Sequence, residues 1–157
     1  MDIPLIEQVK IQAQFLVPLV KTLQAELGEE RANAIVRRAL GEQFRKYGEK
    51  WWRTRGGRNL GEKVASAFEM FAAGDALEYE VVKESPDAVE LNVTRCRYAE
   101  FYEKIGAPEL GFLLTCSGDM DFFHAEGFGA NARLTITQTI MQGASHCDFR
   151  YALKKVP

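Results

Sequence analysis

The hydrophobic pattern of the chain changes its period close to Gly74. Before this point, apolar side chains recur every three or four residues, which is the spacing of one helix face. After it, Leu77, Tyr79 and Val81 alternate with glutamates, which is the spacing of a strand with one buried face. A chain that holds both patterns must pack helices against a sheet, so the sequence predicts an α+β domain.

Three helices are predicted in the first part of the chain. The first carries an apolar stripe over residues 16–27 and the second continues over residues 29–51, with Gly28 between them. Asn59 is the expected N-cap of the third helix. The buried face of that helix is expected to hold Leu60, Val64, Phe68 and Phe71.

The remaining part is predicted to have the element order ββααββ. The segments are a hairpin over residues 77–93, helices over residues 97–105 and from residue 108 to about residue 116 or beyond, and strands near residues 133–141 and 146–154. We expect the four strands to form one antiparallel sheet that helices cover on one face. The 157 residues suffice for one domain, with a helical part (1–75) and an α+β part (76–157) that carries the site.

Composition and charge narrow the class of protein. A net charge of −2 and a sequence pI of about 5.8 argue against binding to nucleic acid or anionic membranes. No apolar run reaches the roughly 20 residues that a membrane span needs. The first ten residues lack the basic segment of a secretory signal. Three cysteines, an odd number, indicate free thiols in a reducing compartment, so a cytoplasmic location is expected.

Residues 146–151, with the sequence HCDFRY, concentrate reactive side chains on one predicted strand. Successive side chains of a strand face opposite sides. His146, Asp148 and Arg150 should therefore share one face, while Cys147 and Phe149 share the other. Cys147 and its neighbour His146 are consequently poorly placed to act together as a dyad.

The cysteines allow three interpretations. Cys147 could be a nucleophile, in which case Asp119 or His124 would be its base. It could instead be a small core residue, since free cysteine is often buried. Cys96, Cys116 and Cys147 with a histidine could bind zinc, although their spacing contains no CxxC pair and a metal is therefore not favoured.

Two further pairs of residues are candidates for binding. Arg150 and Arg95 could hold a carboxylate, because a guanidinium group matches its two oxygens, or they could be exposed arginines of a sheet. Trp51 and Trp52 could mark the surface of a homodimer or the rim of a pocket.

Several segments between residues 92 and 151 together resemble the L-2-amino-thiazoline-4-carboxylic acid hydrolase family. They are NVTRC (92–96), AEF (99–101), GAPEL (106–110), Cys116-x-x-Asp119, TQTIMQG (137–143) and CDFR (147–150). The resemblance implies hydrolytic opening of a cyclic amidine-like ring, with N-carbamoyl-L-cysteine as the product from the aminothiazoline acid. The ring carbon between sulfur and nitrogen is electrophilic, and the departing thiolate is stable, since a free thiol has a pKa of about 8.5.

The resemblance also suggests roles for the residues that match it. Cys147 would attack the ring or position water, and Asp119 and Asp148 would bind the amidine nitrogens or act as base. Arg150 and Arg95 would hold the carboxylate of a small-molecule substrate. The residues expected to complete the site are His146, Cys116, Cys96 and Asn92.

A second resemblance points to a non-catalytic function. The predicted element order and the ending Gly143-x-x-x-Cys147-x-Phe149 are similar to the vinyl-reductase-type ligand-binding domain, a small-molecule sensor or carrier. Those members of that class that bind zinc have a glutamate and a cysteine earlier in the last hairpin. Residues 136–139 here hold neither, so no cofactor is expected. A sensor normally acts on an output domain, which the given sequence does not contain, so we expect the enzyme.

Overall fold

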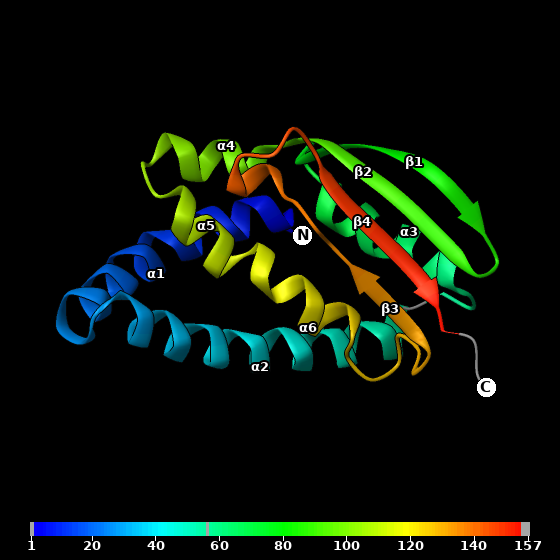
Figure 1. Ribbon diagram of the computed structural model, residues 1–157, viewed down its shortest axis with the longest axis horizontal. Coiled ribbons are helices and arrows are strands. Elements are labelled where there is room, and N and C mark those ends of the chain that lie inside the picture. Colours follow the sequence, from blue (N-terminus) through cyan, green and yellow to red (C-terminus); the bar gives the residue numbers. More distant parts are fainter. Residues whose placement is uncertain (1, 56, 155–157) are drawn as a thin grey trace.

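A computed structural model describes residues 2–55 and 57–154 (Figure 1). Its longer helices are α1 (Leu5–Leu27), α2 (Glu29–Arg55), α3 (Leu60–Ala72), α4 (Arg97–Lys104), α5 (Pro108–Leu114) and α6 (Asp119–Phe123). Two short 3₁₀ helices are η1 (Cys116–Gly118) and η2 (Ile140–Gln142). The strands are β1 (Leu77–Ser85), β2 (Ala88–Cys96), β3 (Ala132–Thr135) and β4 (Cys147–Leu153).

The first three helices form where the sequence predicts them. α1 ends at Gly28, whose φ of 84° lies in the left-handed region that glycine adopts without steric cost. Asn59 caps α3, because its side chain accepts a hydrogen bond of 3.0 Å from the backbone N–H of Glu62. None of the helices in the described part of the chain is both long enough and apolar enough to cross a bilayer.

The four strands form one antiparallel sheet in the order β1-β2-β4-β3. The helices gather on one side of it (Figure 1). On this side, Phe68 of α3 contacts Phe149 and Phe123 of α6 contacts Tyr151, with ring centroids 5.2 and 5.0 Å apart. The predicted α+β architecture is therefore confirmed, and Cys147 shares the buried face with Phe149 as its strand position predicts.

The strand predicted over residues 133–141 is much shorter than expected. β3 ends at Thr135, because the following backbone takes another partner. The N–H groups of Thr137 and Gln138 donate to the side-chain carboxylate of Asp148 in β4, at 2.8 and 2.9 Å, instead of to backbone carbonyl oxygens of that strand. The chain then turns through η2 before it enters β4.

The helix predicted to start at Pro108 also differs from the expectation. It is broken into α5, η1 and α6, and the last two pack against α2. Two glycines allow this close approach. A Cβ on Gly118 would overlap the ring of Phe44, and one on Gly48 would lie 2.6 Å from the carbonyl oxygen of Phe122. The break makes Asp119 the first residue of α6, which packs against α2.

The two adjacent tryptophans lie in the core. Trp51 is 9% exposed and Trp52 is 5% exposed. Trp52 donates a hydrogen bond of 2.9 Å from Nε1 to the carbonyl oxygen of Phe122, and its ring lies 4.9 Å from that of Phe128. The suggestion that this pair forms a dimer surface is therefore wrong, while homodimer formation itself remains a prediction.

Candidate functional site

Three cysteines and one aspartate from four different elements lie near enough to influence one another electrostatically, although they form no hydrogen bond with each other. Cys96 ends β2, Cys116 begins η1, Asp119 begins α6 and Cys147 begins β4. Cys116 lies close enough to the other three for their negative charges to raise the pKa of its thiol. The charge of Asp119 likewise raises the pKa of Cys96 and of Cys147. We call these four residues the thiol–aspartate cluster.

Asp119 is the titratable group of this cluster that changes its charge near neutral pH. The residue is only partly buried, but the protein atoms around its carboxyl group raise the pKa from 3.8 to about 7 by desolvation. Within the described part of the chain, no group donates a hydrogen bond that would stabilise the charged form. A carboxyl group in this state can accept and release a proton at physiological pH.

The three thiols of the cluster, unlike Asp119, keep their protons at neutral pH. Burial raises the pKa of Cys147 to about 11 and that of Cys116 well above its ordinary value. The Sγ atoms of Cys96 and Cys147 accept hydrogen bonds from the backbone N–H groups of Ala99 and Ile140, at 3.4 and 3.2 Å. These bonds lower the pKa of both thiols, but burial outweighs them. All three thiols are therefore protonated at neutral pH.

Tyr151 is a further polar residue near the cluster. It is 1% exposed, and the charge of Asp119 adds to the effect of burial in raising its pKa. Its hydroxyl group has no hydrogen-bond partner among the described residues. The sequence analysis gave Tyr151 no role, although strand alternation puts it on the same face as Cys147.

We expect Tyr151→Phe to stabilise the protein by about 1 kcal/mol, since it removes a buried hydroxyl group that lacks a partner. Tyr98→Phe is the matched control with the opposite sign. The Tyr98 hydroxyl donates a hydrogen bond of 2.8 Å to the carbonyl oxygen of Phe71, so its loss should destabilise by about 1 kcal/mol. Urea unfolding of both variants measures the two changes, and destabilisation by Tyr151→Phe would contradict the expectation.

A cavity of about 810 Å³ lies beside the cluster, between β2, α4, α5 and η2. Cys96 lines it directly. Ile140 also lines it, and the backbone N–H of the same residue donates to the Cys147 thiol. Phe112 and Met141 give the cavity apolar walls. It is open to solvent, and its volume falls in the range of small-molecule sites.

Three of the predicted site residues lie on the opposite face of the sheet from Cys147. The guanidinium group of Arg150 donates to the carbonyl oxygen of Leu91 at 2.9 Å and to Oδ1 of Asn92 at 2.8 Å. Asp148 is next to them and binds the backbone that follows β3. The structure therefore does not bring Arg150, Asn92 or Asp148 together with the cluster.

Arg95 lines the cavity, as a residue that contacts substrate should. Its guanidinium group is held from two sides, with Nε 2.9 Å from a carboxylate oxygen of Glu100 and Nη1 3.5 Å from one of Glu78. Of the two arginines predicted to bind a carboxylate, Arg95 lines the cavity and Arg150 does not. The two ion pairs of Arg95 are exposed to solvent and therefore weak.

The two histidines stand apart from the cluster. Nδ1 of His146 lies 2.9 Å from Oγ of Ser145, in the turn before β4. Nε2 of His124 accepts a hydrogen bond of 3.1 Å from the backbone N–H of Leu134. This bond gives His124 a structural partner at the end of α6, so Asp119 is the better placed of the two bases considered for Cys147.

Metal ligation was the third interpretation of the cysteines. Across residues 2–55 and 57–154, no three side chains of histidine, cysteine, aspartate or glutamate are arranged to hold one metal ion. The three thiols thus share an environment without forming a ligand set, and the structure gives no ground for proposing zinc.

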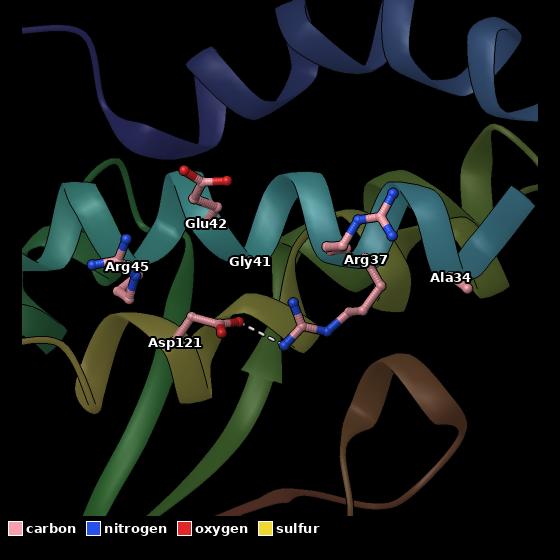
Figure 2. Close-up of a pocket in the computed structure, with 7 residues that line it drawn as sticks. Ala34, Arg37, Gly41, Glu42, Arg45 and Asp121 are labelled. Carbon is pink, nitrogen blue, oxygen red and sulfur yellow. Dashed lines mark hydrogen bonds and ion pairs between the residues drawn. The ribbon is translucent and has the colours of Figure 1, made fainter.

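A second hollow, of about 510 Å³, lies on the outer side of α2 (Figure 2). An ion pair of 2.6 Å between Arg37 and Asp121 crosses it, and Arg38, Glu42 and Arg45 supply most of its remaining lining. It contains no thiol and no aromatic wall. The cluster and its neighbouring cavity therefore remain the candidate site.

One solved structure shows how the fold is used elsewhere. The phenol-responsive sensory domain of the transcription activator PoxR, crystallised with phenol, matches with a TM-score of 0.56 at 13% sequence identity. The match covers 88% of this chain and 72% of that chain. At this identity the likeness shows a shared fold and nothing of the ligand. No curated protein gives a significant match.

The sequence as a whole matches one family model. The model is described as L-2-amino-thiazoline-4-carboxylic acid hydrolase, and it aligns with residues 8–151. This range contains the helical part as well as the segments around the cluster, which extends the resemblance beyond residues 92–151. The chain belongs to the L-2-amino-thiazoline-4-carboxylic acid hydrolase family.

Proposed function

We propose that the protein is a hydrolase that opens small cyclic amidines of the thiazoline type, with Asp119 as the general base. One observation carries the proposal: a carboxyl group with a pKa of about 7, to which no described residue donates a hydrogen bond, lies near three thiols, of which Cys96 lines a cavity. General bases work best when their pKa is close to the working pH. The family of the chain supports the same reaction class.

The reaction requires one water molecule. Its oxygen adds to the ring carbon bonded to sulfur and two nitrogens, and the carbon–sulfur bond breaks. Asp119 accepts one proton from the water and passes it to the departing sulfur. The second proton goes to the ring nitrogen, or to solvent when that nitrogen is already protonated. The product is a urea that carries a free thiol.

The state of the thiols favours water over cysteine as the nucleophile. A thiol reacts as its thiolate, and a pKa of about 11 leaves Cys147 protonated at neutral pH. Cys147 would therefore line the site and position the water, which is the second of the two roles considered for it. Polarisable sulfur atoms also suit contact with a sulfur-containing ring.

We expect Cys147→Ser to keep kcat within about tenfold of the wild type, because the thiol supplies no covalent step. The assay incubates the protein with L-2-aminothiazoline-4-carboxylate and with 2-amino-2-thiazoline, and titrates the thiol released. Samples without substrate correct for the three protein thiols. A correctly folded variant that loses about a thousandfold or more in kcat would indicate an attacking thiolate instead.

A non-catalytic ligand-binding domain is the second candidate. The specific observation in its favour is the likeness of the fold to a sensory domain. The same assay separates the two functions when it is combined with calorimetric titration. Binding of either ring without release of thiol would favour the sensor and overturn the hydrolase.

A further inference from the structure

We infer that two copies of this chain associate through the outer face of α1, with the two helices antiparallel and crossing at Phe15. This face is separate from the candidate site, because no residue of α1 lines the cavity or the second hollow. Association of the chain and its catalytic activity can therefore be tested independently of each other.

α1 carries apolar side chains on two opposite faces. On its inner face, Ala13, Val17 and Val20 are buried in the core. On its outer face, Ile11 and Leu19 are 54% and 55% exposed. Phe15 between them is 75% exposed, more than any other large apolar side chain in the described part of the chain. A helix that is apolar on both sides normally buries both, so the outer face is suited to a further contact.

The outer face forms one uncharged stripe along the helix. Ile11, Phe15 and Leu19 recur every four residues and therefore lie one above another. The helical repeat puts four further exposed and uncharged residues on the same face: Gln8, Gln12, Pro18 and Thr22. We call these seven residues the outer stripe. Helix faces that meet water normally carry charged side chains, so their absence from the outer stripe favours a protein–protein contact.

The order of residues in the outer stripe favours a second copy of the chain over a different protein. In a two-fold symmetric pair of antiparallel helices, a pattern that reads alike in both directions places like side chains together. The outer stripe reads in this way about Phe15. Ile11 and Leu19 lie four residues to either side, and the neutral polar residues Gln8 and Thr22 lie seven residues to either side. A partner of another sequence would not require this symmetry.

The charges beside the outer stripe agree with antiparallel helices. Glu7 and Lys21 flank the stripe on the same side of α1, toward its two ends. When antiparallel helices cross at Phe15, Glu7 of each copy comes close to Lys21 of the other. Parallel helices would place the two Glu7 side chains together and the two Lys21 side chains together, and like charges repel each other.

A second exposed apolar surface is less suited to self-association. Val81 and Val82 are 53% and 52% exposed on β1, which is an edge strand of the sheet. The same strand carries three exposed glutamates and a single lysine. Two copies of β1 would bring mainly like charges together, which opposes pairing.

Sedimentation velocity from micromolar to near-millimolar concentration tests the proposal, and we expect a reversible dimer. Phe15→Asp should raise the dissociation constant of the dimer by about thirtyfold or more, because it puts a charge at the centre of the interface. Val81→Asp puts the same charge on β1 and is the matched control, which should dimerise like the wild type. Both side chains are exposed, so both variants should keep the fold, which circular dichroism checks.

Two results would overturn the proposal. One is a wild type that stays monomeric at every concentration. The other is a dimer that Phe15→Asp leaves intact, which would place the interface on another surface of the chain.

Cysteine cross-linking tests the orientation of the helices separately. Gln8 of one copy and Thr22 of the other face each other when antiparallel helices cross at Phe15. A mixture of Gln8→Cys and Thr22→Cys should therefore form a disulfide-linked dimer under mild oxidation, and neither variant alone should do so. The wild type, which has three thiols of its own, measures the background. Linking of each variant with itself, or no linking in a mixture that sediments as a dimer, would overturn the antiparallel arrangement.

Discussion

Replacing Asp119 by Asn is expected to lower kcat/KM by about 10²- to 10⁴-fold, the usual contribution of a general base. Asparagine keeps the shape of the side chain but accepts no proton from water. The rate of thiol release from 2-amino-2-thiazoline measures the loss. Asp121→Asn is the matched control, because Asp121 lies on the same short helix but pairs with Arg37 away from the cavity. The control should retain activity within about twofold of the wild type.

The pH dependence gives a sharper test of the same role. The base must be ionised, so kcat/KM of the wild type should rise with pH and level off above the pKa of about 7 of Asp119. A bound amidinium would favour the charged carboxylate, so the corresponding limb of kcat should lie at lower pH. Asp119→Asn should lose the limb, and Asp121→Asn should keep it. Full activity in Asp119→Asn would exclude Asp119 as the base.

Much of the fold follows from local rules that act over a few residues. The alternation of β2, the cap at Asn59 and the glycine after α1 all act within one element, and the structure agrees with each. The buried face predicted for β1 is wrong, because β1 is an edge strand of the sheet on which Tyr79 and Val81 stay exposed. β3 is shorter than its sequence pattern predicts, and the reason is a contact with a residue distant in the sequence. Asp148, which comes from another strand, captures the N–H groups of Thr137 and Gln138 and ends the pairing.

The candidate site, like the fold, could be predicted from the sequence only where local rules decide the structure. Strand alternation alone puts Cys147 on the opposite face of β4 from Asp148 and Arg150. It could therefore already have indicated that the thiols and the arginine expected to bind a carboxylate do not share one site. The burial of Asp119 has no such sequence signal. It depends on the break between α5 and α6 and on the close approach to α2 that Gly118 allows. Because the altered pKa is a product of tertiary packing, the residue type and spacing did not reveal it.

The contribution of Asp119 to the stability of the wild type should fall as pH rises from about 4 to 7. In the unfolded chain its carboxyl group ionises near 3.8, whereas in the folded protein it stays protonated up to about pH 7. Below the lower value both states are protonated and the residue has no effect on stability. Between the two values only the unfolded state gains from ionisation. Above pH 7 the folded state therefore carries a constant penalty, which the partial exposure of Asp119 to solvent reduces.

Asp119→Asn removes this penalty, so the variant predicted to be least active should gain on the wild type as pH rises. Urea unfolding at pH 4.5 and pH 8 gives the free energy of unfolding of the variant relative to the wild type at each pH. The change of this relative stability between the two pH values measures the gain, and any pH-independent effect of the asparagine cancels in it. Asp121→Asn should show no comparable gain. Parallel stability curves for Asp119→Asn and the wild type would mean that the folded protein does not hold this carboxyl group protonated. The catalytic proposal would then lose its basis, since the desolvation that weakens the fold is the same desolvation that makes Asp119 a base near neutral pH.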